Sequence, residues 1–249
     1  MGTVKLSWNE IQQAPVFVIN MDECKDRMNI TGNRIRNAGY TDIRRISAID
    51  ARNCNLVDEW NKFGNPKFNT SKSIETEFEI YLGKQGCLLS WLKTLQEIIS
   101  LNIKVATVFE DDVLFHKDFA LLAPEYYKAT PDNFELCYLG SQIDAIIDIT
   151  IPDILISPPV FCTHAIMFTL EGAKKLYNFI VNNPDGIYTI DWMMKDMAYL
   201  PLEQQPYIYY VWNSMRFHDP AREMPKEWIK RNCGLVFQDY YLGTYVQER

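Results

Sequence analysis

Short runs of β-branched and aromatic residues alternate along this chain with amphipathic segments, and this alternation constrains the fold more than any other feature. The runs that predict buried strands are Val16–Asn20, Ile43–Ile49, Val105–Phe109, Leu136–Leu139, Val160–Phe168 and Tyr207–Val211. Strands that alternate with helices predict an α/β fold, in which helices cover both faces of a central, mostly parallel sheet. In such sheets, ligands bind beyond the carboxyl ends of the strands.

Three segments between these runs are expected to form helices. The segment after the first strand has its apolar residues on one helical face and stops at Gly39. Gly86 is expected to open the most regular helix, because apolar residues then recur at helical spacing through Ile99. Glu171–Val181 is the third. The polar stretch from about Arg52 to Glu79 predicts a long excursion away from the sheet.

Charge and cysteine usage narrow the class of protein. A formal net charge of −7 and a pI near 5.1 argue against a binder of nucleic acid or anionic membranes, since either would need a basic field. The six cysteines form no C-x-x-C pair, so they show no zinc or thioredoxin motif. Several lie in apolar runs, among them Cys137 and Cys162, which indicates reduced, buried thiols. Without a signal peptide or a run of 18 apolar residues, the chain is expected to be cytoplasmic, with no transmembrane segment.

Three consecutive carboxylates, Glu110, Asp111 and Asp112, directly follow the strand at Val105–Phe109. Their like charges repel unless a cation or solvent relieves them. Because side chains alternate along a strand, we expect Glu110 and Asp112 to point one way and Asp111 the other. Two oxygen ligands with open positions for phosphate suit Mg²⁺ or Mn²⁺ on a nucleotide diphosphate. The alternative is that these acids cap the next helix or are solvated.

Four segments, in order, resemble glycosyltransferase family 25, which includes lipooligosaccharide galactosyltransferases and collagen β-galactosyltransferases. They are VFVINMDECKDRM (Val16–Met28), RISAIDARN (Arg45–Asn53), GKQGCLLSWLKTLQEI (Gly83–Ile98) and VATVFEDDVLF (Val105–Phe115). Their combination is far more specific than any one motif. Downstream, Cys162–Leu176 and the pair Asp191-Trp192 resemble later segments of the family more loosely.

The resemblance implies a GT-A-like nucleotide-diphospho-sugar transferase fold in one domain over residues 1–249. Its nucleotide-binding half would span about 14–115, and its acceptor and catalytic half about 116–249. The implied activity is metal-dependent and inverting: galactose or glucose moves from a UDP-sugar, with Mn²⁺ or Mg²⁺ as cofactor. The acceptor would be a hydroxyl on a glycan, a lipid-linked glycan or a protein, and no nucleic acid would be bound.

The resemblance also implies roles for particular residues. Asp112 is expected to bind the metal, Glu110 the metal or the ribose, and Asp111 the donor sugar or the metal. The residues expected to hold the nucleotide are Asn20, Asp22, Arg27, Asp50, Ser90 and Lys93. Three of these have alternatives. Arg27 could form a surface ion pair that contributes about 0–1 kcal/mol, Ser90 could cap its own backbone, and Lys93 could be solvated. Trp91 stands where the family often has His, which favours core packing.

Inversion requires a base to remove the acceptor proton, and Asp191 is our candidate because it adjoins an aromatic ring that could stack on a sugar. The alternative is an ordinary first-turn acid that follows an N-cap at Thr189. If Asp191 is not the base, the next candidates are Asp144, Glu171 and Asp185. His218 is a candidate third metal ligand, with a surface histidine as the alternative.

Two other functions remain open at this point. A non-catalytic sugar-nucleotide-binding or glycan-binding relative would keep the fold and lose the base or the metal. A metal-dependent phosphohydrolase would use the same acids on a simple phosphate ester. The intact acidic triplet argues against the first of these, and a requirement for uridine would argue against the second.

Overall fold

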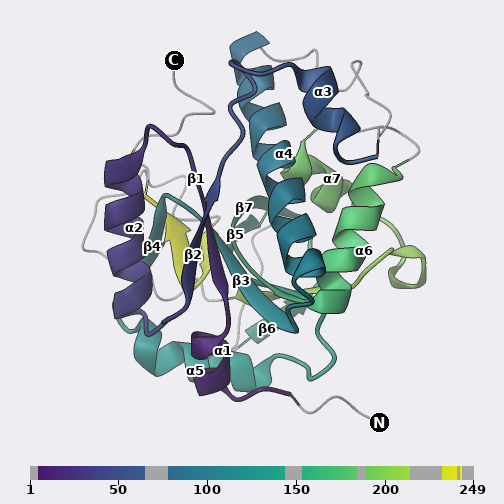
Figure 1. The fold of residues 1–249 in the computed structure, drawn as a ribbon. Helices are drawn as coiled ribbons and strands as arrows, with labels where there is room; N and C mark the ends of the chain where they lie inside the picture. The colour runs from purple at the N-terminus through teal and green to yellow at the C-terminus, as the bar shows by residue number, and fades with distance from the viewer. Residues whose placement is uncertain are drawn as a thin grey trace.

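In the computed structural model, residues 5–64, 78–143, 153–183, 189–213, 232–239 and 242 are described. Their central sheet has the strand order β2-β1-β3-β7-β5-β8-β6, with β9 added on β5 (Figure 1). The bounds are β1 Val16–Asn20, β2 Ile43–Ser47, β3 Val105–Glu110, β5 Leu136–Ile143, β6 Asp153–Ile156, β7 Val160–Thr169, β8 Tyr209–Asn213 and β9 Asn232–Gly234. A separate two-stranded sheet pairs β4 (Val113–Phe115) with β10 (Val236–Gln238).

The strand directions confirm a mostly parallel α/β sheet. β2, β1 and β3 pair in parallel, and so do β5 and β8. β7 lies between these groups and runs against both β3 and β5. Consequently β2, β1, β3, β5 and β8 all point the same way, while β7, β6 and β9 point the other way. The carboxyl ends of β1, β2 and β3 therefore meet at one edge of the sheet.

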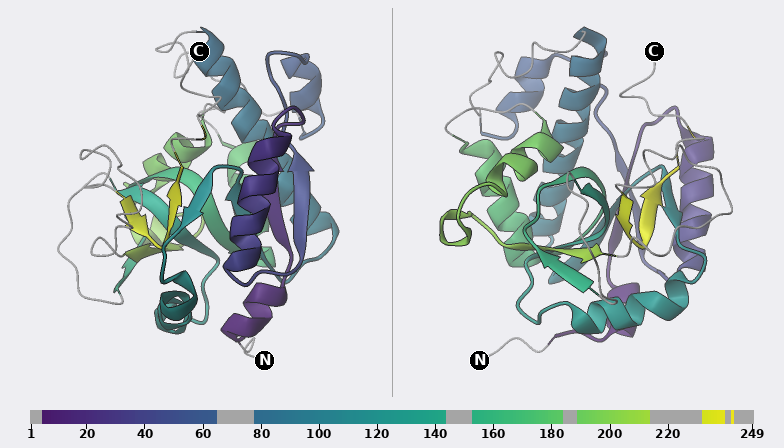
Figure 2. Two further views of the ribbon diagram at one scale, coloured as in Figure 1. Left: turned by 90° about the vertical axis from the view of Figure 1, so that its left-hand side faces the viewer. Right: turned by 180° about the vertical axis from the view of Figure 1, so that it is seen from behind.

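Helices cover both faces of the sheet, as the alternation predicted (Figure 2). The alternating side chains of β1 show the division: Phe17 and Ile19 belong to one apolar core, Val16 and Val18 to the other. The first core includes side chains of α3 (Leu56–Asn61), α4 (Phe78–Ser100), α6 (Leu170–Val181) and α7 (Ile190–Met197). The second includes side chains of α1 (Trp8–Gln13), α2 (Lys25–Asn37) and α5 (Phe119–Ala129).

Gly86 lies inside helix α4 and does not open it, so this predicted boundary was wrong. The helix begins eight residues earlier, at Phe78. A glycine is needed at position 86 because a Cβ there would lie 2.5 Å from the carbonyl oxygen of Ile49. The glycine thus lets α4 pack directly against the loop that follows β2, which is a requirement of packing rather than of helix termination.

The excursion predicted for residues 52–79 contains regular structure. Helix α3 lies within it, and the side chain of Asn55 caps that helix by accepting from the N–H groups of Val57 and Asp58. Residues 65–77 lie outside the described residues. Elsewhere the expected elements are present with shifted ends: β2 stops at Ser47, and β5 continues to Ile143. Among the helices described, none is both long and apolar enough to cross a membrane.

Candidate active site

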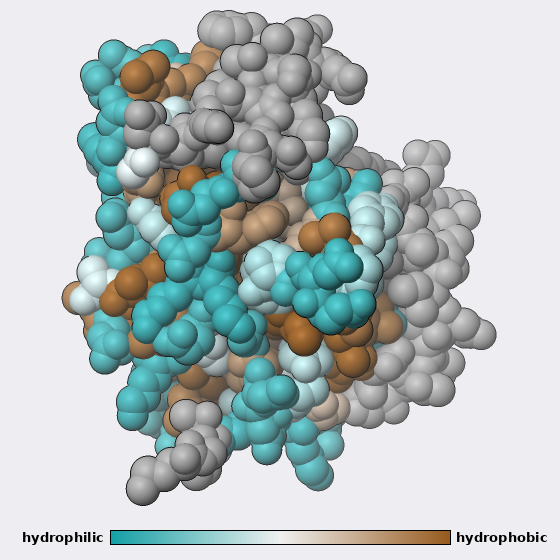
Figure 3. Space-filling view, turned by 90° about the vertical axis from the view of Figure 1, so that its right-hand side faces the viewer, coloured by the Kyte–Doolittle hydropathy of each residue, from teal (hydrophilic) through white to brown (hydrophobic). Residues whose placement is uncertain are grey.

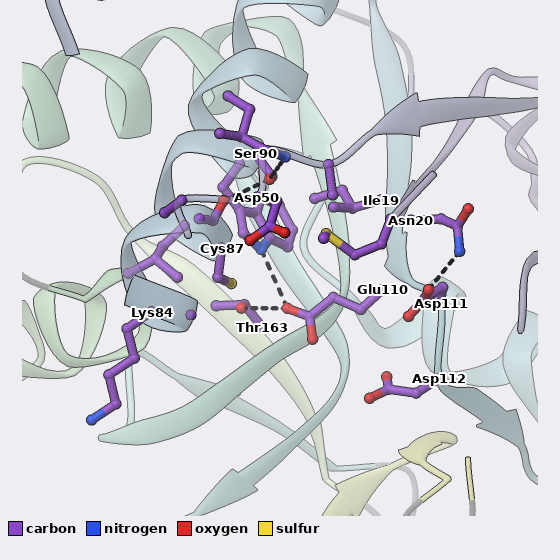
Figure 4. A pocket seen from close by; sticks show the side chains of 18 of the residues that line it. Ile19, Asn20, Asp50, Lys84, Cys87, Ser90, Glu110, Asp111, Asp112 and Thr163 are labelled. Atoms are coloured by element: carbon purple, nitrogen blue, oxygen red, sulfur yellow. Dashed lines mark hydrogen bonds between the residues drawn. The ribbon is translucent and has the colours of Figure 1, made fainter. Parts of the chain in front are cut away.

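A cavity of about 230 Å³ opens where β1, β2 and β3 end. The loops after β1 and β2 line one side, and the N-terminal half of α4 and the start of α7 line the other. Between them lies the turn after β3, which carries Asp111 and Asp112 and is called the acidic turn below. Of the residues predicted to form the site, the cavity is lined by Asn20, Arg27, Asp50, Ser90, Glu110, Asp111, Asp112 and Asp191. Figure 4 labels Asn20, Asp50, Ser90 and the three acids Glu110, Asp111 and Asp112. The structure thus brings together side chains from both halves of the chain.

Glu110, the last residue of β3, is held by two donors that the sequence did not single out for this role. Its Oε1 accepts from Thr163 Oγ1 at 2.9 Å and from Trp91 Nε1 at 3.3 Å. Burial raises the pKa of Glu110; these two hydrogen bonds lower it in part, and the charges of Asp111 and Asp191 raise it further. Trp91 is buried in the core as predicted, and its indole N–H also orients this carboxylate.

Asp111 and Asp112 occupy the turn between β3 and β4, where strand alternation no longer applies. Asp111 accepts from Asn20 Nδ2 at 2.6 Å and from Arg27 Nη2. The same Arg27 nitrogen lies 3.6 Å from Asp112 Oδ2. Asp111 is thus held from the end of β1 and from α2, while Glu110 is held from α4 and β7. Arg27 pairs with these aspartates from α2 and is not a surface residue.

The carboxylate of Asp112 is buried beside those of Glu110 and Asp111. Its side chain is 6% exposed, and Oδ1 is buried without a hydrogen-bond partner in the structure. Burial raises the pKa of Asp112 well above its ordinary value, and the neighbouring charge of Glu110 adds to this shift. A divalent cation would satisfy Oδ1 and relieve the repulsion, so the residues present fit Mn²⁺ or Mg²⁺.

The protein alone does not supply a full ligand set in the part of the chain that is described. There, no group of three or more His, Cys, Asp or Glu is placed to hold a metal ion. Glu110 and Asp112 would contribute oxygens, and a bound diphosphate would contribute others, as is usual for Mg²⁺. His218, the predicted third ligand, lies outside the described residues.

The backbone of the acidic turn is fixed by residues distant in sequence. The N–H of Asp239 donates to the carbonyl oxygen of Asp112 at 2.6 Å. Arg34, on α2, donates to the Asp239 carboxylate at 2.6 Å and to the carbonyl oxygen of Val113 at 3.0 Å. Sequence reasoning missed both residues, because nothing in their local pattern connects positions 34, 112 and 239.

Asp50 and Ser90 belong to the end of the cavity next to β2. The carboxylate of Asp50 accepts from Arg52 Nε and Asn53 Nδ2, each at 2.7 Å, and the hydrogen bond from Arg52 lowers its pKa. Ser90 Oγ donates to Gly86 O at 2.6 Å and accepts from Ile49 N at 2.8 Å. Since its one hydroxyl hydrogen is used on the helix backbone, Ser90 positions the loop that carries Asp50.

Two predicted nucleotide contacts, Asp22 and Lys93, are not brought into the cavity. Asp22 is exposed and accepts from Arg45 and from Ser47 Oγ, which lower its pKa. Lys93 Nζ donates to Ser47 O at 2.8 Å. Both side chains are engaged with residues of β2, and this local pairing keeps them out of the cavity lining.

Asp191 lies in the first turn of α7 and faces the cavity from the side opposite the loops. Its Oδ1 accepts from the N–H of Trp192 at 2.9 Å. Burial raises the pKa of Asp191, and the ammonium group of Lys84 opposes part of that shift. Thr189 is at the N-cap position, but its side chain makes no capping hydrogen bond.

Of the alternative bases, only Glu171 is among the described residues, and it does not line the cavity. Glu171 is exposed on α6 and pairs with Lys174 at 2.7 Å. Asp144 and Asp185 lie outside the described residues. Asp191 is therefore the one of these four that the described structure places in the cavity, and it is close enough to Glu110 for its charge to raise the pKa of that carboxyl.

The chain is similar to a protein family and to solved structures. The family model described as "Glycosyltransferase family 25 (LPS biosynthesis protein)" matches residues 13–146, which is more than half of the chain. A solved structure, the crystal structure of a glycosyltransferase involved in the glycosylation of the major capsid of PBCV-1, aligns with 91% of this chain and 92% of its own. The sequence identity is 10% and the TM-score 0.44. No curated protein matches.

Proposed function

The chain belongs to glycosyltransferase family 25, and from this premise we propose that it transfers a hexose, galactose or glucose, from a UDP-sugar to an acceptor hydroxyl. The transfer would invert the anomeric carbon and depend on Mn²⁺ or Mg²⁺. The acceptor would be a glycan, a lipid-linked glycan or a protein. The family itself establishes glycosyl transfer, and the arguments below concern the donor, the metal and the base.

The buried, unpartnered Oδ1 of Asp112 carries the proposal for the metal. Leaving a carboxylate oxygen buried and unpaired is costly, on the order of several kcal/mol for a charged group. Glu110 and Asp112 are the ligands we propose, and Arg27 and Asn20 hold Asp111 beside them. When bound, the cation would neutralise the diphosphate that leaves with the nucleotide.

The two ends of the cavity suit the two substrates. The loops after β1 and β2 offer apolar surface from Ile19 and Ala48 and polar groups from Asp50, a combination that suits a nucleoside. Asp191 lines the cavity from the first turn of α7, apart from these loops, and an acceptor would approach the sugar there. The donor would thus lie across the acidic turn, with its base toward β2 and its sugar toward α7.

Asp191 is the proposed base. The acceptor oxygen attacks the anomeric carbon from the face opposite the diphosphate, its proton passes to the Asp191 carboxylate, and the bond to UDP breaks with its electron pair leaving on the phosphate oxygen. A base is most effective when its pKa is raised toward the working pH, and burial shifts Asp191 in that direction.

Titration calorimetry with UDP, with and without Mn²⁺, tests the nucleotide and the metal together. UDP should bind much more tightly with Mn²⁺, and Asp112→Ala should abolish that difference. Asp132→Ala serves as the control, because Asp132 is exposed and far along the chain from the cavity lining. Equal affinity of Asp112→Ala and the parent protein would remove the acidic turn from the site.

Turnover separates the proposal from its two alternatives. A screen of nucleotide sugars for metal-dependent hydrolysis should single out one UDP-hexose. Binding of UDP without any turnover would favour a non-catalytic relative. Release of phosphate from simple esters, with no preference for uridine, would favour a phosphohydrolase.

A further inference from the structure

Two exposed aromatic rings accompany the helix that carries Asp191. Among the exposed large hydrophobic side chains of the described residues, Trp192 and Tyr199 are the aromatic ones, 46% and 63% exposed. Trp192 directly follows Asp191 in α7, and Tyr199 comes two residues after the helix ends at Met197. On the side of the molecule where α6 and α7 lie, hydrophobic side chains are exposed among hydrophilic ones (Figure 3).

A lysine lies against each of these rings. The ammonium nitrogen of Lys84 is 5.9 Å from the centre of the Trp192 ring. That of Lys195 is 5.9 Å from the Tyr199 ring and 4.3 Å from the Phe161 ring. Lys84 and Lys195 thus each place a cation next to aromatic surface on a chain whose net charge is −7.

Lys84 links this aromatic surface to the reaction site. It lines the cavity from α4, and its charge acts on the carboxyl of Asp191, which burial otherwise shifts to a higher pKa. In Figure 4, Lys84 lies across the cavity from Asp112. A substrate group bound at Lys84 would therefore lie beside the base and away from the acidic turn.

We propose that Lys84 and Trp192 form an acceptor subsite for a sugar that carries a negatively charged group, a carboxylate or a phosphate. This inference rests on the proposed function. The weakly positive C–H face of the sugar would stack on the Trp192 ring, whose face is negative. Its anionic group would pair with the Lys84 ammonium, and a neighbouring hydroxyl would then face Asp191.

Charge complementarity supports an anionic acceptor over a neutral one. The rest of the cavity holds Asp50, Glu110, Asp111, Asp112 and Asp191, which would repel an anion that lacked a cation of its own. Arg27 is already paired with Asp111, and Arg52 with Asp50. Lys84 forms no ion pair with a carboxylate of the described residues, so its charge is directed at the ring and the base.

Binding of three small glycosides to the protein saturated with UDP and Mn²⁺ tests the subsite, with ligand-observed NMR as the readout. The probes are methyl β-D-glucopyranoside, methyl β-D-glucuronide and methyl β-D-glucopyranoside 6-phosphate. Both anions should bind about tenfold more tightly than the neutral sugar, the gain expected from a charge-assisted contact. Whichever anion binds more tightly identifies the charged group.

Variants assign the preference to the two residues. Lys84→Met should remove the preference for anions, and Lys84→Arg should retain it. Trp192→Ala should weaken all three glycosides, and Trp192→Phe should restore most of the binding. Lys174→Met is the matched control, because it removes an equivalent charge from α6, away from the cavity lining.

Several results would overturn the subsite. They are equal binding of the three glycosides, no binding of any of them, or an anion preference that survives in Lys84→Met. A loss of UDP affinity in Lys84→Met would instead place this lysine on the donor diphosphate and would equally end the proposal. If the parent protein does not bind UDP at all, it is the proposed function that fails.

Discussion

Thr163 Oγ1 lies 2.9 Å from Glu110 Oε1, and this hydrogen bond from β7 orients the carboxylate at the end of β3. Trp91 Nε1 donates to the same oxygen from α4. Both donors meet one oxygen, so Glu110 is left with Oε2 for a ligand. The site therefore depends on residues that are not acidic and are 53 and 19 positions away in sequence.

Thr163→Val removes this donor while keeping the side-chain shape. A hydrogen bond to a charged group contributes about 1.5–3 kcal/mol, so the Mn²⁺-dependent affinity for UDP should fall about tenfold or more. Thr163→Ser, which keeps the hydroxyl, should restore it to within about threefold. Titration calorimetry measures both. If valine and serine behave alike, Thr163 does not orient Glu110.

Asp112→Asn should stabilise the metal-free protein. The folded-state pKa of this carboxyl is raised by burial, so at neutral pH its ionised form favours the unfolded chain. Removing the charge should raise the melting temperature by about 2–4 °C for each ~1 kcal/mol gained. UDP with Mn²⁺ should no longer raise it further. Differential scanning fluorimetry measures both melting temperatures. If Asp112→Asn melted at a lower temperature than the parent protein without ligand, the ionised Asp112 would not destabilise the metal-free fold.

The same raised pKa values of Glu110 and Asp112 predict opposite effects of pH on binding and on stability. As pH falls through these pKa values, protonation removes the negative charge needed by a cation, so Mn²⁺-dependent UDP affinity should fall. The midpoint should lie above the ordinary carboxyl range of about 4. Over the same interval, their contribution to the stability of the metal-free protein should improve. Calorimetry and thermal melts between about pH 4 and 8 measure the two trends.

Asp191→Asn should leave UDP affinity unchanged and lower the turnover of transfer by about 10²–10⁴, the usual effect of losing a positioned base. The activity of the parent protein should decline toward acid pH with a midpoint above that of an ordinary aspartate, because burial raises the pKa of Asp191. Asp196→Asn, on an exposed position of the same helix, is the control. A near-normal rate for Asp191→Asn would exclude it as the base.

Gly86→Ala should destabilise the protein by about 1–3 kcal/mol and weaken UDP binding. The new Cβ would lie 2.5 Å from Ile49 O, which is backbone and cannot rotate aside, so the loop bearing Asp50 must move. Alanine favours helices by up to about 1 kcal/mol over glycine, which is too little to compensate. Gly32→Ala is the matched control in α2, where the nearest atom would be 3.6 Å away. Chemical denaturation compares the two.

Much of the fold follows from local pattern. Strand β1 appears with the predicted bounds, because a β-branched and aromatic run buried on both faces has few other solutions. The position of the acidic turn at a strand end also followed from sequence, since Val105–Phe109 leads directly into it. The error at Gly86 arose because a glycine needed for close approach in the interior of a helix has the same local signature as one at its end.

The sequence by itself determined that three carboxylates follow an apolar strand and lie at an edge of the sheet, since the end of a strand depends on neighbouring residues. Tertiary structure decided which groups meet them. Arg27 is brought to Asp111 from α2, Thr163 to Glu110 from β7, and Asp239 to the backbone of Asp112 from the strand β10 end. Which residues contact the carboxylates depends on how helices and strands far apart in the chain pack against one another, and no local sequence pattern specifies that packing.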